Sequence, residues 1–492
     1  MAEFDVEYDL VVCGSGAAGK SAALIAARAG QKVVILEKMD QTGGSSVYAE
    51  GTGAFESIEQ KERKVPANPK YHFPTKQEAY DNYMEWTHDR ANADVARAFV
   101  DNAWETISIY RELGVEYMTV CTAEFGKVPE VAKDMWSFHI TDGFGAHLQE
   151  VLLDAVQKEG VDIFCSTPAK ELIVEDGKVV GVLAESEGDP LRVGGKAVIL
   201  ATDGCGDSPE LIEKYSWCYP SARRMNKYTN LENVGDGLRM ALSVGADPHN
   251  ITLVPTLGPS GLGKGLDSQS GGAAVQPEVW VNRKGKRFVA ESKAESVMEL
   301  GGVFGKQPDG VTWSIMSAEE VDRLAKNGPD FGPGFFVPYG KPMSTLWTEL
   351  NQDVEDGLAF KADTLGELAE KIGVDKEAFL QTMADYNKAC DGGYDPVCEK
   401  KPQYLRPLKN GPFYAIGITV GTMGCSGGVK VNGNMQVVDE HYDPIPGLYA
   451  AGWDADGLWG DTYDHLVPGS GNGFAHTSGR IAARHFLSTL ER

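Results

Sequence analysis

The fold is indicated most clearly by the segment Tyr8-Asp9-Leu10-Val11-Val12-Cys13 and by Gly14-Ser15-Gly16-Ala17-Ala18-Gly19, which follows it directly. Its aliphatic, β-branched first half is typical of a strand buried in a parallel sheet. Residues 18–29 are rich in alanine and predict a helix that Gly30 ends, and residues 32–36 predict a second strand. The order strand, helix, strand predicts a βαβ unit of an α/β fold.

The glycine spacing of this unit, G-x-G-x-x-G, is typical of a site for the pyrophosphate of a dinucleotide. Gly14 makes a tight turn, Gly16 lets the backbone approach the phosphates, and Gly19 lets the helix pack on the strand. The helix N-terminus adds partial positive charge. Glu37 ends the second strand, where a carboxylate can accept hydrogen bonds from ribose hydroxyls. The expected contacts are Gly14, Ser15, Gly16, Ala17, Ala18, Gly19 and Glu37.

A second glycine-rich segment, Lys38-Met39-Asp40-Gln41-Thr42-Gly43-Gly44-Ser45-Ser46, comes directly after Glu37. In a simple NAD-binding domain, the chain would continue into a helix and a third strand. Two glycines and two hydroxyls here favour a second close approach to a longer cofactor, FAD, whereas a plain glycine turn is the alternative. The contacts expected from this segment are Lys38, Met39, Thr42, Gly43, Gly44, Ser45 and Ser46.

Together the two segments resemble the superfamily of FAD-dependent fumarate reductases, succinate dehydrogenases and 3-ketosteroid dehydrogenases. Later segments continue the resemblance in the same order, at residues 198–204, 234–238, 279–288 and 447–452. The resemblance implies an α/β fold, with a Rossmann-like FAD-binding domain of the glutathione-reductase type and an inserted α+β cap domain. The expected division gives residues 1–255 and 412–492 to the FAD-binding domain and residues 256–411 to the substrate cap domain.

Two stretches of the expected cap, residues 317–326 and 365–390, have apolar and charged residues at helical spacing. Ser317 and Glu320 form the capping-box pattern at the start of the first. In the first domain, residues 171–182 predict a β-hairpin with its turn at Asp176-Gly177.

The resemblance assigns further FAD contacts. The base of the hairpin, at Ala169, is implied to lie near the adenine, and Asp203 replaces a glycine of the family's A-T-G-G turn. A helix that follows the glycine-rich residues 468–473 is implied to stabilise negative charge on the reduced flavin. The contacts implied in this way to noncovalent FAD are Ala169, Thr202, Asp203, Gly204, Asp454, Gly471, Asn472 and Gly473.

Residues that family members use to bind dicarboxylates are replaced in this chain. The family's T-N-H is Thr229-Asn230-Leu231, and residues 268–275, near the place of an arginine proton donor, contain no basic residue. The family's H-T-M-G-G motif corresponds to residues 420–428, which lack its histidine. The arginine of the family's final glycine-rich segment is replaced in the region of residues 466–468. Because dianion recognition requires charge-assisted hydrogen bonds, we do not expect fumarate as the substrate.

Aromatic residues are frequent between residues 453 and 465, a segment that the family architecture implies to lie over the flavin ring. Indole rings suit a flat, ring-bearing substrate. The expected substrate contacts are Trp453, Trp459 and Leu231. The candidate catalytic proton donors are Tyr463, His465 and Asp461. The alternative is a surface loop whose aromatic residues pack against the cap.

We therefore expect an FAD-dependent oxidoreductase that transfers hydride between flavin N5 and a carbon of an apolar cyclic or phenolic substrate. Tetrahydrodaidzein, converted to equol, is the substrate that the resemblance favours. A 3-ketosteroid dehydrogenase is the main alternative. A fumarate-type enoate reductase and a non-enzymatic electron-transfer flavoprotein subunit are the remaining ones.

The composition limits the partners. The 492 residues include 46 Lys and Arg against 71 Asp and Glu, a formal charge of −25 that disfavours nucleic acid and anionic membranes. Residues 1–7 lack the features of a signal peptide, no segment has the roughly 18 apolar residues of a membrane span, and the eight cysteines form no C-x-x-C. We expect a cytoplasmic protein without a metal site, whose electrons come from NAD(P)H or a separate redox protein.

Overall fold

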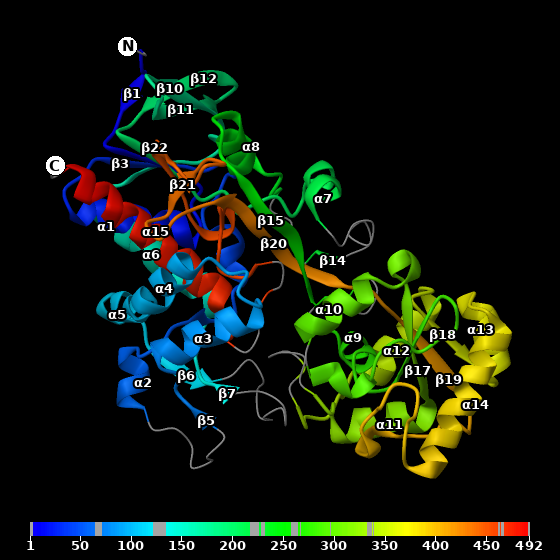
Figure 1. Ribbon diagram of the computed structural model, residues 1–492. Coiled ribbons are helices and arrows are strands. Elements are labelled where there is room, and N and C mark those ends of the chain that lie inside the picture. The colour runs from blue at the N-terminus through cyan, green and yellow to red at the C-terminus, as the bar shows by residue number, and fades with distance from the viewer. Residues whose placement is uncertain are drawn as a thin grey trace.

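The chain folds into a larger body that holds both termini and a smaller body joined to it by long strands (Figure 1). The computed structural model describes residues 3–63, 71–121, 134–216, 226–227, 232–256, 264–265, 267–295, 297–331, 337, 339–460, 463 and 467–490.

A six-stranded sheet forms the centre of the larger body, in the order β21-β22-β13-β2-β3-β9. Its strands are β2 (Leu10–Cys13), β3 (Val33–Leu36), β9 (Asp162–Phe164), β13 (Ala197–Leu200), β21 (Gln436–Val438) and β22 (Pro444–Ala450). The pairings are parallel except that of β21 with β22. Every residue of β2, β3 and β13 is buried, as expected for aliphatic strands of a parallel sheet. Helices α1 (Ala17–Arg28) and α15 (Ser470–Leu490) contact each other and this sheet.

The predicted hairpin is confirmed. Strands β10 (Ala169–Glu175) and β11 (Lys178–Ser186) pair antiparallel, and β12 (Asp189–Gly194) and β1 (Val6–Glu7) extend them into a four-stranded sheet. Asp176 and Gly177 both have positive φ, 48° and 77°, as two-residue hairpin turns of type I′ require.

Short helices and small sheets complete the larger body. Its other helices are η1 (Gly44–Tyr48), α2 (Ile58–Glu62), α3 (Lys76–Trp86), α4 (Ala93–Asn102), α5 (Trp104–Glu112), α6 (Phe144–Lys158), α7 (Pro209–Tyr215), α8 (Asp236–Ser243) and η6 (Gly452–Asp454). Its other strands include β4 (Thr52–Gly53), β6 (Tyr117–Cys121) and β8 (Phe138–Thr141), which form one sheet, and β5 (Tyr71–His72) and β7 (Asp134–Met135), which pair with each other.

A four-stranded sheet in the order β16-β17-β19-β18 forms the centre of the smaller body. Its strands are β16 (Val279–Asn282), β17 (Thr312–Ser317), β18 (Ala359–Ala362) and β19 (Phe413–Ile418). The helices around it are α9 (Gln269–Ala274), η3 (Glu291–Glu295), α10 (Val297–Gly305), η4 (Pro308–Gly310), α11 (Ala318–Asn327), α12 (Leu346–Glu355), α13 (Leu365–Ile372), α14 (Lys376–Gly392) and η5 (Pro402–Tyr404). One face of the sheet shares a separate hydrophobic cluster with α13 and α14.

The two predicted cap helices differ in outcome. The first is confirmed, because α11 begins after Ser317, whose side chain accepts a hydrogen bond from the Glu320 N–H. The second is divided in two, since Gly373 ends α13 with a φ of 68° and Asp375 caps α14. Residues 365–390 therefore contain two helices.

Two long strands, β15 (Pro248–Thr256) and β20 (Gly421–Lys430), run between the bodies (Figure 1). Strands β14 (Asn226–Lys227) and β23 (Ala455–Asp456) pair with β20. The division of the chain into domains stays a prediction. Because β19 pairs with β17 and β18, we propose that the return to the FAD-binding domain comes after Ile418, a few residues later than residue 411.

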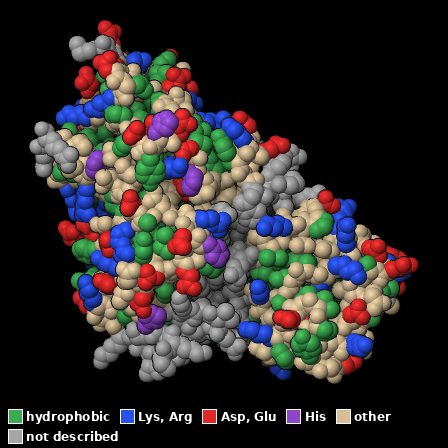
Figure 2. Space-filling view, in the orientation of Figure 1, with side chains coloured by type: hydrophobic (Ala, Val, Ile, Leu, Met, Phe, Trp, Pro, Cys, Tyr) green, Lys and Arg blue, Asp and Glu red, His purple; other side chains and the backbone are tan. Residues whose placement is uncertain are grey.

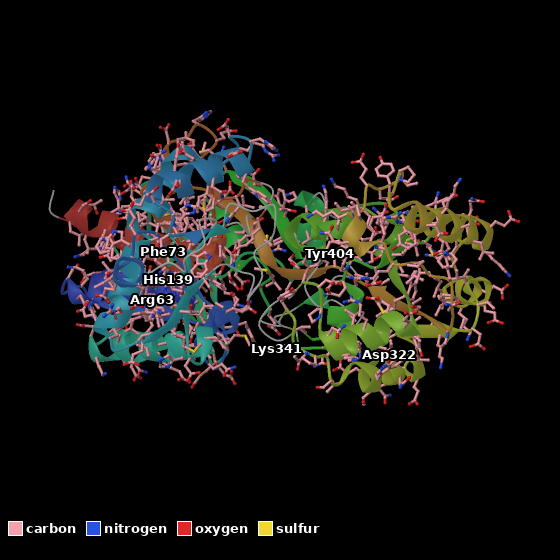
Figure 3. All side chains as sticks on the ribbon, turned by 90° about the horizontal axis from the view of Figure 1, so that it is seen from below. Arg63, Phe73, His139, Asp322, Lys341 and Tyr404 are labelled. Carbon is pink, nitrogen blue, oxygen red and sulfur yellow. The ribbon has the colours of Figure 1, made fainter. Side chains whose placement is uncertain are left out.

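Acidic and basic side chains alternate over the visible face of both bodies, without a large patch of one sign (Figure 2). Within the described ranges, no helix has the length and apolar character needed to cross a membrane. The seven described cysteines are free thiols. Figure 3 labels residues of each body, with Arg63, Phe73 and His139 on the larger and Asp322, Lys341 and Tyr404 on the smaller.

Candidate cofactor site

The first glycine loop lies between the carboxyl ends of β2 and β13 and the start of α1. Gly14 has a φ of 105°, and a Cβ there would lie 2.1 Å from the Ala201 carbonyl oxygen. A Cβ on Gly19 would lie 1.9 Å from the Gly14 carbonyl oxygen, so the tight turn and the close helix packing expected of these glycines are both present. At Gly16, by contrast, a Cβ would meet chain atoms only at 3.7 Å or more. Its missing side chain leaves room for a ligand at the start of α1, which fits a pyrophosphate.

Glu37, directly after β3, forms hydrogen bonds with the first glycine loop. The N–H and hydroxyl of Ser15 donate to Glu37 Oε2 over 3.0 and 2.6 Å, and the Met39 N–H donates to Oε1 over 2.9 Å. The carboxylate is nearly buried, with 7% of the residue exposed. Each carboxylate oxygen can accept more than one hydrogen bond, so a ribose contact at Oε1 stays a prediction.

The second glycine loop packs directly on the first. Gly43 has a φ of 129°, and its N–H donates to Ser15 Oγ over 3.2 Å. The Ala17 N–H, in the first turn of α1, donates to Ser46 Oγ over 3.2 Å. The structure therefore brings together the two segments that the sequence assigns to the same cofactor.

The neighbours of this loop vary in burial. Thr42, Gly44 and Ser45 are partly buried, and Ala18 is buried. Lys38 forms a 3.0 Å ion pair with Asp236 at the start of α8.

The turn after β13 is held by Asp454. The Thr202 hydroxyl donates to Asp454 Oδ2 over 2.9 Å, and the Gly204 N–H donates to Oδ1 over 3.0 Å. Burial raises the pKa of Asp454 despite these bonds. Asp454 thus positions the turn, and a direct contact between Asp454 and FAD stays a prediction. Ala169 lies partly buried at the start of β10, opposite Ala184.

The N-terminus of α15 contains buried polar atoms without protein partners. Ser470 Oγ and Asn472 Oδ1 have no hydrogen-bond partner within the described part of the chain. Such atoms are rare in folded proteins, and bound ligands can satisfy them. The carbonyl and N–H groups along the pyrimidine edge of a flavin have the required polarity, and the helix N-terminus favours negative charge there. The residues present therefore fit FAD.

Strand β4 supports this helix terminus, a role that the sequence analysis missed. The side-chain amide of Asn472 donates to Thr52 Oγ1 over 2.9 Å. A Cβ on Gly473 would lie 2.3 Å from the Gly53 carbonyl oxygen. The only local signal was the glycine spacing of Gly51-Thr52-Gly53.

The aromatic residues after β22 form one cluster against α15. Trp453 and Trp459 have ring centroids 4.7 Å apart, and Tyr463 lies 5.3 Å from Trp459. Phe474 of α15 contacts Trp459 edge-on at 5.4 Å. These rings therefore pack on one another and on α15, and their position over the flavin stays a prediction.

The side chains of this aromatic cluster differ in how far they are exposed to solvent. Trp459 is only 2% exposed, whereas Trp453 is partly exposed, so Trp453 is the better placed of the two to contact a substrate. The Tyr463 oxygen accepts a 2.9 Å hydrogen bond from the Gly471 N–H. The other expected residues of this group, Leu231, Asp461 and His465, lie outside the described residues.

Comparison with known proteins assigns a family. A family model described as an FAD binding domain matches residues 9–474. The chain is 35% identical over 491 residues to the vinyl phenol reductase of Lactiplantibacillus plantarum, covering 97% of this chain and 96% of that protein. It is 26% identical over 460 residues to the NADH:fumarate oxidoreductase of Klebsiella pneumoniae, covering 92% of this chain and 45% of that protein.

A solved structure shows the same fold. It is a 3-ketosteroid-Δ4-(5α)-dehydrogenase from Rhodococcus jostii RHA1 in complex with 4-androstene-3,17-dione, with a TM-score of 0.74, 22% identity, and coverage of 99% of this chain and 98% of that one. The α/β FAD-binding fold with a cap is thus confirmed. The chain therefore belongs to the FAD binding domain family, and it is an FAD-dependent oxidoreductase.

Proposed function

We propose that this oxidoreductase reduces phenolic substrates at a side-chain or ring carbon conjugated with a para-hydroxyl group. The observation that carries the proposal is the 35% identity, over almost the whole of both chains, to a vinyl phenol reductase. Two features of this chain support it. The segments expected to bind dicarboxylates lack the family's cationic residues, and a cluster of aromatic rings contacts the start of α15 through Trp453 and Tyr463.

The para-hydroxyl group gives two different phenols a common route. Protonation of a vinyl phenol at its terminal carbon, with loss of the phenolic proton, gives a para-quinone methide. Protonation of the benzylic hydroxyl of tetrahydrodaidzein, with loss of water and the phenolic proton, gives one as well. Hydride at the benzylic carbon and a proton on the phenolate then complete a two-electron reduction, which yields equol in the second case. Bound FAD supplies the hydride from N5.

Tyr463 is the proposed proton donor. Its oxygen accepts the Gly471 N–H at the N-terminus of α15, and the peptide dipoles of that helix favour negative charge on the oxygen after the proton leaves. The ring packs against Trp453 and Trp459, which holds the phenol oxygen in place beside α15. His465 and Asp461 remain alternative donors, and Trp453, Trp459 and Leu231 remain the proposed substrate contacts.

The electron donor is proposed to be separate from this chain. We propose that NAD(P)H, or a redox protein in the cytoplasm, reduces noncovalently bound FAD.

A 3-ketosteroid dehydrogenase is the second candidate, because a steroid enzyme shares the fold over 99% of this chain. The two candidates differ in direction, since a dehydrogenase takes hydride from its substrate. A fumarate-type reductase and a non-enzymatic electron-transfer subunit rank below both.

A substrate panel tests the proposal. The holoenzyme is photoreduced without oxygen and mixed with para-vinylphenol, tetrahydrodaidzein or fumarate, while flavin absorbance is followed and products are identified. We expect both phenols, and not fumarate, to reoxidise the flavin. Reoxidation by fumarate alone would contradict the proposal. Bleaching of the oxidised protein by a 3-ketosteroid would favour the second candidate instead.

A further inference from the structure

Asp203 occupies a strained position next to the cofactor site. The resembling family has glycine here, and Asp203 has a φ of 74°, in the left-handed region that residues with a Cβ seldom adopt. Strained residues of this kind concentrate at functional sites. The carboxyl group of Asp203 is therefore a candidate for a specific role.

The Asp203 side chain lies where three cofactor-binding segments meet. Its own turn, which follows β13, contacts the first glycine loop, because a Cβ on Gly14 would lie 3.3 Å from the Thr202 nitrogen. Ser45 of the second glycine loop lies close enough to this carboxylate to lower its pKa. The side-chain amide of Asn233, just before α8, donates to Asp203 Oδ2 over 2.7 Å.

The charges around Asp203 are mostly negative. Asp207, on the same turn, and Asp454, of η6, both raise its pKa. On α8, Asp236 is paired with Lys38 and Arg239 is paired with Glu210, so these nearby cations already have acidic partners. Desolvation is the largest cause of the shift, the contacts with Ser45 and Asn233 oppose it, and together these effects raise the pKa of Asp203 to about 7 before any ligand charge is added.

FAD adds further negative charge at this place. Its pyrophosphate carries two negative charges, and both glycine loops that frame Asp203 are the expected pyrophosphate contacts. A like charge disfavours ionisation of a neighbouring carboxyl group. We infer that Asp203 is a protonated FAD ligand, so that FAD binding is coupled to the uptake of one proton by this carboxyl group.

This inference rests on FAD binding alone and is independent of the proposed phenolic substrate. Its test is the dissociation constant of FAD, measured without substrate from the fluorescence of FAD released when the full-length holoenzyme is diluted, between about pH 6 and pH 9. If FAD binding is coupled to the uptake of one proton, the dissociation constant of FAD does not change with pH below the pKa of Asp203 in the flavin-free protein. Above that pKa, the dissociation constant rises about tenfold per pH unit. Calorimetric titration of the flavin-free protein in two buffers of different ionisation enthalpy should show net proton uptake near pH 8.

Asp203→Asn is the decisive variant, because its amide imitates the neutral carboxyl group. We expect it to bind FAD as tightly as the wild type near pH 6 and at least tenfold more tightly near pH 9. Asp207→Asn is the matched control, since it removes a neighbouring carboxyl group and should keep the pH-dependent rise. The same pH profile in the wild type and Asp203→Asn, or weaker binding by Asp203→Asn at every pH, would overturn the inference. If the phenols fail as substrates, this result is unaffected.

Discussion

Tyr463 joins the aromatic cluster to the first turn of α15. Replacing it with phenylalanine removes the hydroxyl group and keeps the ring contacts with Trp453 and Trp459. We expect single-turnover reduction of para-vinylphenol to slow by about a hundredfold or more, the usual loss for a positioned proton donor, with FAD content unchanged.

Tyr394→Phe is the matched control, because Tyr394 is 62% exposed in the smaller body. It should react at the wild-type rate. An unaltered rate in Tyr463→Phe would rule out Tyr463 as the donor and turn attention to His465 and Asp461.

Glu37 accepts three hydrogen bonds from the chain, two of them from Ser15 in the first glycine loop. Hydrogen bonds to a charged group contribute roughly 1.5–3 kcal/mol each. Glu37→Ala should therefore release FAD at least tenfold more readily, as measured by the flavin that remains bound after gel filtration. Glu56→Ala, also on the larger body, should stay yellow. A fully yellow Glu37→Ala protein would contradict the assigned role.

Some residues of the site could be predicted because their signal is local. The roles of Gly14 and Gly19 follow from spacing within one βαβ unit, and the structure has both. The partners of Asp454 could not be predicted in this way, since Thr202 lies 252 residues away in sequence. Only the folded chain shows that this carboxylate holds a turn.

At the scale of elements, Gly373 decides how the region 365–390 is divided. The helical spacing on both sides of it predicted helical structure but no boundary, and its φ of 68° ends α13. A single glycine in a periodic pattern gives only a weak signal, because glycine is also tolerated inside helices. The local capping pattern of Ser317, in contrast, was sufficient to place the start of α11.

Gly373→Ala should lower the stability of the protein by about 1 kcal/mol, because alanine is strained at positive φ. No atom lies within 4 Å of the Cβ it would add, so the effect is one of backbone conformation. Gly392→Ala, at the last residue of α14 and equally free of contacts, should be neutral or stabilising. Thermal unfolding midpoints test the pair, and equal midpoints would contradict this explanation of the helix break.

The link between β15 and β23 contains a pH-dependent contact. Asp456 hydrogen-bonds to His249 and raises its pKa. Protonated His249 therefore stabilises the fold fully below its ordinary pKa near 6.5, and this contribution is lost as the pH rises through the higher folded value.

His249→Gln should thus lower the unfolding midpoint more at about pH 5.5 than at about pH 9. Because the ring is 41% exposed, the effect should stay below about 1 kcal/mol. His441→Gln, whose side chain is 75% exposed, is the control and should show little change. An equal or opposite pH dependence of the His249 variant would refute the contact as a source of stability.

For the whole molecule, the order of motifs predicted the two-part architecture, and the sheet of the larger body follows from its aliphatic strands. The return point proposed after β19 (Phe413–Ile418) rests on the pairing of this strand with β17 and β18, which the sequence does not show. The proposed substrate site also depends on the whole fold. The rings of Trp453, Trp459 and Tyr463 come together only when β22 and α15 pack against each other.

The most direct test of the central claim compares para-vinylphenol with para-vinylanisole, its O-methyl ether, as oxidants of the photoreduced holoenzyme in the absence of oxygen. A quinone methide can form only from the free phenol. We predict rapid flavin reoxidation and formation of para-ethylphenol with the first compound and no reaction with the second. Equal rates with both compounds, or reoxidation by neither while fumarate reacts, would contradict the account.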